Sequence, residues 1–269
     1  ISFAQAGRLF AGTSTGSILS AGFSVGLSAA RMHELYCELA REVFPRTLRS
    51  RLWLLTRYRY SNKPLISALK SVLGETEMGE LWTERSKKDL VIVLRDLVEN
   101  RNLFVKPWKA KYRRWPIWAA VLASSTVPTY FPVFKGRYID GGVGSYSNPS
   151  YVAAYEAAFV LRDCPLEETT LISLGTGTSP TGMKPGQASK LRAWNWIGPV
   201  LDAFTIDAAR QQIHLVHRSP SIIAARRWLP VHPFPARRLL PCGPRCESPA
   251  AACAPAGRAP RQKPPGWRL

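Results

Sequence analysis

The sequence predicts an α/β fold, because segments with a strand pattern alternate with segments with a helix pattern. The composition is that of a folded protein: 46% of the residues are apolar and 10% are aromatic, which excludes disorder of the chain as a whole. A length of 269 residues suits one large domain or two small ones.

The first predicted unit is a short strand at residues 8–12 that leads into a helix at residues 15–30. Residues 9–30 carry no charge and are numerous enough to cross a bilayer. Half of them are Gly, Ser or Thr, so we interpret this stretch as buried protein and not as a membrane span.

Two helices and several strands are predicted next. Residues 32–44 place apolar side chains on one face, and Pro45 ends this helix. A second helix at residues 64–73 is followed by Gly74. Residues 89–94 (DLVIVL) are almost continuously apolar, which is typical of a buried parallel strand. The remaining predicted elements are a strand at 103–105, a helix at 116–124, a strand at 137–139, a helix at 149–161, a strand at 170–174 and a helix at 200–216.

The net charge of +19 is unevenly distributed. Residues 210–269 contain eleven basic residues and a single acid, Glu247, together with half of the 22 prolines. No helical or strand period is visible after Pro230, so we expect a folded domain at residues 1–217 and a disordered Pro/Arg-rich tail at residues 218–269. Such a tail either binds nucleic acid or anionic lipid through its charge or has no evolved function.

The five cysteines give neither a disulfide framework nor a zinc-ligand spacing. The sequence shows no signal-peptide pattern, which favours a cytoplasmic or peripheral membrane location.

Residues 12–16 (GTSTG) match G-x-S-x-G between a predicted strand and a predicted helix, which is the context of a nucleophile elbow. Gly12 and Gly16 permit a tight turn, and Ser14 would lie at a helix N-terminus. There the amide of Thr15 and the helix dipole can stabilise an oxyanion.

A serine nucleophile requires a base, and two answers remain open. The order Ser14, Asp140, then His214 or His217 mimics the triad of α/β-hydrolases, although that fold places its elbow after several strands. Alternatively, Asp140-Gly141-Gly142 follows a predicted strand on a turn that can approach another loop closely, so the carboxylate would reach the serine directly.

These two motifs and their surroundings resemble the patatin-like phospholipase family. The segments that carry the resemblance are residues 123–132 (ASSTVPTYFP), 138–143 (YIDGGV), 148–150 (NPS) and 171–177 (LISLGTG), and it extends over about residues 8–217. The resemblance implies a three-layer α/β/α sandwich and a Ser-Asp dyad that cleaves acyl esters of phospholipids or related lipids, with no metal, cofactor or histidine. Position by position, it makes Ser14 the nucleophile and Asp140 the base.

The family also has a glycine-rich oxyanion loop a few tens of residues before the elbow. Eleven residues precede Gly12 here, so we expect this loop and the first strand to be missing from the sequence, while the Thr15 N–H would remain. An alternative function is therefore that of a truncated, inactive homologue that only binds anionic lipid or nucleic acid through its basic surface.

Two stretches mix basic and aromatic residues: residues 46–63, and residues 106–118 with five cations among Trp108, Tyr112, Trp115 and Trp118. This mixture suits the headgroup region of an anionic bilayer, single-stranded nucleic acid, or a solvated loop whose aromatics are partly core. The resemblance to lipid hydrolases favours the membrane surface over nucleic acid.

Overall fold

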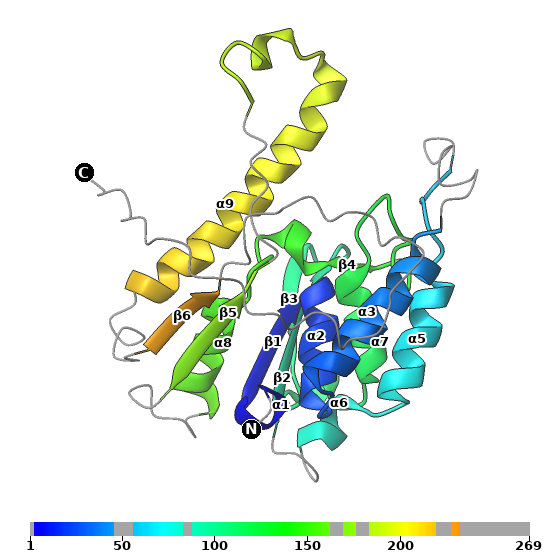
Figure 1. The fold of residues 1–269 in the computed structure, drawn as a ribbon, viewed down its shortest axis with the longest axis vertical. Helices are drawn as coiled ribbons and strands as arrows, with labels where there is room; N and C mark the ends of the chain where they lie inside the picture. Colours follow the sequence, from blue (N-terminus) through cyan, green and yellow to red (C-terminus); the bar gives the residue numbers. More distant parts are fainter. Residues whose placement is uncertain are drawn as a thin grey trace, which may run out of the picture.

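The computed structural model describes residues 3–45, 56–82, 88–161, 169–175, 183–218 and 227–231. These residues form a three-layer α/β/α structure in which helices cover a central mixed sheet (Figure 1). The predicted fold class is therefore confirmed. Most of the predicted tail, residues 219–226 and 232–269, lies outside the described residues.

Strand β2 (Asp89–Asp96) is the centre of the sheet, as its apolar sequence predicts. It pairs in parallel with β1 (Leu9–Thr13) and antiparallel with β3 (Arg101–Val105) and β4 (Tyr138–Asp140). The expectation of a buried parallel strand is therefore confirmed for burial and for the pairing with β1. It is wrong for the other two neighbours, because residues 97–100 form a short turn that returns the chain as a hairpin and because β4 also runs against β2.

The register places β1 and β4 end to end along one edge of β2. Residues 92 and 93 of β2 pair with both β1 and β3, so these two strands occupy opposite edges. Residues 94–96 pair with both β3 and β4, so β4 lies on the same edge as β1. Thr13 at the end of β1 is opposite Val93, and Asp140 at the end of β4 is opposite Leu94. The two chain segments that carry the sequence motifs therefore meet at adjacent positions of one strand.

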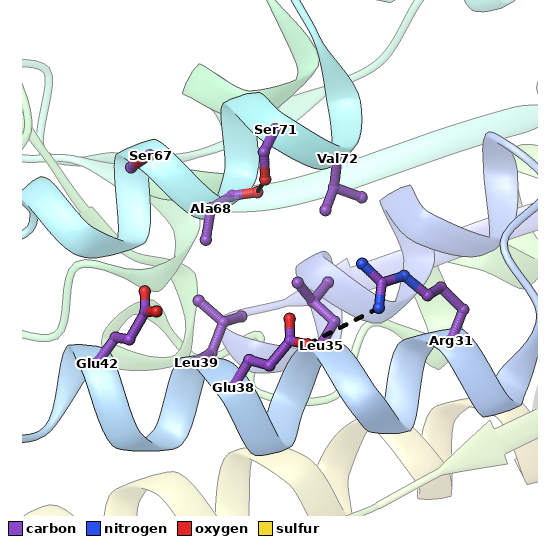
Figure 2. A pocket seen from close by; sticks show the side chains of 9 residues that line it. All are labelled: Arg31, Leu35, Glu38, Leu39, Glu42, Ser67, Ala68, Ser71 and Val72. Carbon is purple, nitrogen blue, oxygen red and sulfur yellow. Dashed lines mark hydrogen bonds and ion pairs between the residues drawn. The ribbon is translucent and has the colours of Figure 1, made fainter.

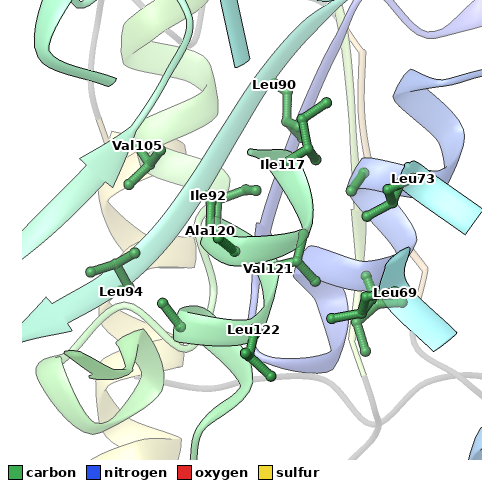
Figure 3. Packing of buried hydrophobic residues seen from close by; sticks show 14 of the residues in the cluster. Leu69, Leu73, Leu90, Ile92, Leu94, Val105, Ile117, Ala120, Val121 and Leu122 are labelled. Carbon is green, nitrogen blue, oxygen red and sulfur yellow. The ribbon is translucent and has the colours of Figure 1, made fainter. Parts of the chain in front are cut away.

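The main hydrophobic core lies on one face of the sheet. Leu90, Ile92 and Leu94 of β2 are fully buried against α7 (Ile117–Ser125) and its neighbour α5 (Lys63–Leu73), as Figure 3 shows. Val91 and Val93 point to the other face and are also fully buried. Both faces of β2 are therefore covered, which explains its almost continuous apolar sequence.

Helix α2 (Thr15–Ser24) follows β1 directly and is shorter than the predicted helix. The chain turns at Gly26, whose φ of 91° is left-handed, and Ser28 then caps α3 (Ala29–Val43) by accepting a hydrogen bond from the Arg31 amide. The helix predicted at 15–30 therefore ends at Ser24, and its last two residues instead begin α3, which corresponds to the helix predicted at 32–44. Two short helices complete this half, α1 (Phe3–Ala6) and α6 (Met78–Glu80).

The second half of the chain adds α8 (Ser150–Tyr155), which continues as a π-helical segment, Glu156–Leu161, in place of the single predicted helix. Strand β5 (Thr170–Leu174) was predicted, but its parallel partner β6 (Arg227–Val231) falls inside the segment for which no regular structure was expected. That expectation is wrong for these five residues, since β6 supplies the neighbour that β5 requires. Helix α9 (Ile197–Arg218) is slightly longer than predicted and packs on α8. The short 3₁₀ helices are Ala110–Tyr112, Gly141–Gly144, Ala188–Lys190 and Ala193–Trp196.

Candidate active site

Ser14 occupies a strained turn between β1 and α2. Its φ of 55° and ψ of −131° are rarely adopted by a residue with a side chain, and such strain costs about 1–3 kcal/mol. Gly12 makes the turn possible, because a Cβ there would collide with the carbonyl oxygen of Gly16 and lie 2.6 Å from the Ser17 Cα. Gly16 itself has open space where a Cβ would be. The local geometry is that of a nucleophile elbow.

Asp140 lies at the end of β4, beside Ser14. Its side chain is 3% exposed and accepts hydrogen bonds from the Ser14 side chain and, at 2.7 Å on Oδ1, from the Gly142 amide. Gly141 lets the turn press against β2, since a Cβ at this position would lie 2.6 Å from the carbonyl oxygen of Val93. The Asp-Gly-Gly turn therefore holds the carboxylate against the serine through backbone contacts.

Burial is the main influence on Asp140. Removal of water raises the pKa of its carboxyl group above the ordinary value, and the hydrogen bonds from Ser14 and Gly142 oppose this rise without cancelling it. A carboxylate with a raised pKa is a stronger base than an exposed one.

Two serines at the end of α7 hold the Ser14 backbone in place. The Ser124 hydroxyl accepts a hydrogen bond from the Ser14 amide at 2.9 Å and donates one to the Val93 carbonyl at 2.6 Å. The Ser125 hydroxyl donates to the Ser14 carbonyl at 3.2 Å. Both serines lie in residues 123–132, one of the segments that carry the family resemblance. No role could be predicted for them, because no local pattern in the sequence indicates that α7 lies beside the elbow.

The first turn of α2 presents its N-terminus at the site. Thr15 is exposed, and its amide belongs to the group of N-terminal amides that have no acceptor within the helix. The Tyr36 hydroxyl of α3 donates a hydrogen bond to the Thr15 carbonyl at 2.5 Å, which fixes this turn from the outer side. The dipole of α2 adds positive potential at the same place.

The loop after the Asp-Gly-Gly turn also contacts the site. The Thr13 hydroxyl donates to the Tyr146 carbonyl at 2.7 Å, and Ser147 lies next to Gly142. The Ser147 hydroxyl donates in turn to the Thr205 carbonyl of α9 at 3.1 Å. This loop therefore connects the elbow to α9.

No histidine among the described side chains is hydrogen-bonded to Ser14 or Asp140. His33 lies on the exposed side of α3, where its Nε2 is 3.9 Å from the Cys37 Sγ, and His214 is exposed on α9. The His217 side chain and the whole of His232 lie outside the described part. Of the two histidines that the triad could use, His214 is thus not hydrogen-bonded to either residue.

The basic and aromatic stretch at residues 106–118 is partly internal. Lys106 is 5% exposed and forms a buried ion pair with Glu156, which also accepts a hydrogen bond from the Trp108 indole at 3.1 Å. Tyr112 is buried, and Trp115 and Trp118 pack against the core. The reading of this stretch as a loop with core aromatics is therefore correct for these side chains, while Lys109, Lys111, Arg113 and Arg114 remain exposed. Most of the stretch at 46–63 lies outside the described residues.

A groove separates α3 from α5 on another part of the surface (Figure 2). Leu35, Leu39 and Val72 lie on its walls, and Arg31 forms an ion pair with Glu38 at its rim at 3.9 Å. Its serines, Ser67 and Ser71, lie on regular turns of α5, and the Ser71 hydroxyl donates to the Ala68 carbonyl of its own helix. The groove therefore lacks the serine and base arrangement of the elbow.

No helix within the described residues is long and apolar enough to cross a membrane.

Comparison with known proteins finds relatives that are named as phospholipases and patatins. The chain is 28% identical over 205 residues to the cGAMP-activated phospholipase of Escherichia coli (strain TW11681), covering 71% of this chain and 55% of the relative. It is 26% identical to patatin-like protein 1 of Oryza sativa subsp. indica, covering 72% of this chain and 56% of the relative. It is 29% identical to the 85/88 kDa calcium-independent phospholipase A2 of Mus musculus, covering 63% of this chain and 23% of the relative.

The chain thus spans little more than half the length of the first two relatives, and less of the third. A family profile described as Patatin-like phospholipase matches residues 7–153, which include β1 to β4, the elbow and the Asp-Gly-Gly turn. Because this match covers more than half of the 269 residues, the chain belongs to the patatin-like phospholipase family.

Proposed function

We propose that this chain is a serine acyl hydrolase that cleaves fatty-acyl ester bonds of phospholipids or related lipids, with Ser14 as nucleophile and Asp140 as base. The observation that carries the proposal is the hydrogen bond from the Ser14 side chain to the buried carboxylate of Asp140, at a strained turn between a strand and a helix. Membership of a family of lipid hydrolases supports the choice of substrate.

The reaction would proceed in two steps. The Ser14 Oγ attacks the acyl carbonyl while Asp140 accepts the serine proton and passes it to the leaving alcohol. Water then attacks the acyl-enzyme, again with Asp140 as base, and the fatty acid leaves while Ser14 regains its proton. No charge other than that of the tetrahedral oxyanion has to be stabilised by the protein in either step.

The amide of Thr15 is the donor that we assign to this oxyanion. It lies at the N-terminus of α2, where the helix dipole has the same favourable sign. Ser124 and Ser125 act as positioning residues, because they hold the Ser14 backbone through which both the nucleophile and the Thr15 amide are oriented.

The test is fatty-acid release from phospholipid vesicles by the whole chain, compared with Ser14→Ala and Asp140→Asn. Removal of either member of a nucleophile and base pair is expected to lower kcat by about 10⁴-fold. A fluorophosphonate probe should label the unchanged chain at Ser14 and leave Ser14→Ala unlabelled. Equal fatty-acid release by all three proteins, or no labelling at Ser14, would reject the proposal in favour of an inactive lipid-binding homologue.

A further inference from the structure

Helix α9 carries one row of side chains that is buried in one half of the helix and exposed in the other. The row begins in the 3₁₀ turn before α9 and repeats every four residues, so its members lie on successive turns, each about 40° further around the helix than the one before. Ala208, Gln212 and Val216 are 8%, 6% and 4% exposed. Trp196, Val200 and Phe204 are 41%, 41% and 73% exposed.

The inner half of this row packs against the body of the protein. Val216 forms a small buried cluster with Ala154 of α8, against which Tyr151 and Leu171 also pack. The outer half continues beyond the body and carries residues 183–196 at its end (Figure 1). The inner half of α9 thus buries its side chains against the body, while the outer half exposes three large apolar side chains on successive turns.

The segment that precedes the exposed row is basic. Lys184, Lys190 and Arg192 are all exposed, and the sequence from 183 to 201 contains no acidic residue. Asp202 lies two residues before Phe204, about 200° around the helix at about 100° per residue, and therefore faces away from the row. Asp207 is paired with Arg210 at 3.7 Å.

We propose that this tip, defined as residues 183–204, binds the surface of an anionic lipid bilayer and brings the bilayer to Ser14 and Asp140. The proposal rests on the proposed function for the nature of the substrate. Trp196, Val200 and Phe204 would enter the interface, and the three cations would contact lipid headgroups.

The position of the tip relative to the site supports a bilayer as its binding partner. Phe204 directly precedes Thr205, whose carbonyl accepts the hydrogen bond from Ser147 beside the Asp-Gly-Gly turn. Val143, next to that turn, is itself 52% exposed. A bilayer that covers Phe204 would therefore lie close to the entrance of the site.

Charge disfavours a second copy of the chain as the occupant. In a two-fold contact the same patch meets itself, so the three cations of one tip would face the three of the other. An anionic surface instead attracts all of them.

The test measures binding separately from catalysis, by using the Ser14→Ala chain in flotation with phosphatidylcholine vesicles that do or do not contain phosphatidylglycerol. The tip should bind the anionic vesicles more strongly. Replacing Lys184, Lys190 and Arg192 by Gln should weaken this binding by about 100-fold, because each cation contributes a factor of about five. Val200→Ser with Phe204→Ser should weaken binding to either vesicle by at least about tenfold.

Matched controls are available elsewhere on the surface. Replacing Lys109, Lys111 and Arg114 by Gln removes the same number of exposed cations, and Val98→Ser removes an exposed apolar side chain from the turn after β2. Both controls should bind as the parent does. A loss of binding in the 109–114 control with none in the tip variants would overturn the proposal and assign the membrane surface to the stretch that the sequence first suggested.

A second measurement separates this proposal from the proposed function. With Ser14 intact, the tip variants should hydrolyse the soluble ester p-nitrophenyl butyrate at the parent rate but lose activity on anionic vesicles. If neither the parent nor the tip variants hydrolysed the soluble ester, the result would count against the proposed function but not against the proposed tip, because vesicle binding by Ser14→Ala is measured independently. The proposed tip would be overturned if the tip variants bound vesicles as strongly as the parent does. It would also be overturned if the parent bound no vesicles and instead formed a concentration-dependent dimer that Phe204→Ser abolishes.

Discussion

The junction of β1 and β4 and the outer half of α9 are linked through Ser147, yet they are built in opposite ways. At the junction, Asp140 is buried, Gly12 and Gly141 allow backbones to touch, and Ser14 is held in a strained conformation. The outer half of α9 is a regular helix that exposes Val200 and Phe204 on successive turns. Glycines and apolar side chains in a sequence indicate that a segment packs closely against something. They do not show whether it packs against another segment of the same chain or against a different molecule.

The largest effect expected within the junction is that of Gly12→Ala. The new methyl group would meet backbone atoms of Gly16 and Ser17, which cannot move aside, so the free energy of unfolding should fall by about 3 kcal/mol. Gly16→Ala is the matched control, because a Cβ there meets nothing within 4 Å and the residue lies within α2. Chemical denaturation of both variants measures the difference; equal losses would mean that the turn is not as closely packed as described.

Ser124→Ala should lower the free energy of unfolding by about 2 kcal/mol, since the Ser14 amide loses its acceptor and the Val93 carbonyl its donor. Because Ser124 positions Ser14, the rate of fluorophosphonate labelling should fall as well. Ser71→Ala, which removes an exposed hydroxyl from α5, is the control for both measurements. A change in stability without any change in labelling rate would show that Ser124 has only a structural role.

Two valines of one helix compare its two halves directly. Val216→Ala removes two buried carbon atoms and should lower the free energy of unfolding by about 1.5 kcal/mol. Val200→Ala, at 41% exposure, should change it by less than about 0.5 kcal/mol. A large loss at Val200 would mean that the outer half is covered by the chain itself, and would remove the ground for the proposed tip.

The pH dependence of the reaction should reflect the buried carboxylate. As the proposed base, Asp140 would act only when ionised, so kcat/KM should fall about tenfold per pH unit below its raised pKa, and this fall should begin above the pH expected of an exposed aspartate. Stability should change in the opposite sense. Since the folded state binds this proton more tightly than the unfolded state, the contribution of Asp140 to stability is present at low pH and is lost as pH rises through the raised pKa.

Asp140→Asn separates these two effects. At neutral pH it should be inactive and at least as stable as the parent, because it removes a carboxylate that is ionised in a buried place. A profile of kcat/KM that is flat down to the ordinary pKa of aspartate would argue against Asp140 as the base.

Local patterns in the sequence were enough to predict most of the elements. The apolar run at 89–94, the helix ending before Gly74 and the strand at 170–174 all appear in the structure at or near their predicted positions. The predictions were wrong where pairing with a strand distant in the sequence determines the structure. Strand β2 is parallel to one strand and antiparallel to two others, and β6 forms by pairing with β5. Lys106 and Trp108 looked like surface residues because Glu156, their partner, is 50 and 48 positions away from them in the sequence.

What the sequence determined by itself is the elbow, because Gly-x-Ser-x-Gly between a strand and a helix is a matter of local sterics. It also predicted a helix at residues 200–216, since helical periodicity is a local property. Only the tertiary structure decided that Asp140 meets Ser14, through the register that places β1 and β4 end to end on β2, and that the row of α9 leaves the body halfway along the helix. Both depend on contacts between residues distant in the sequence, for which the periodicity of a single chain carries no signal.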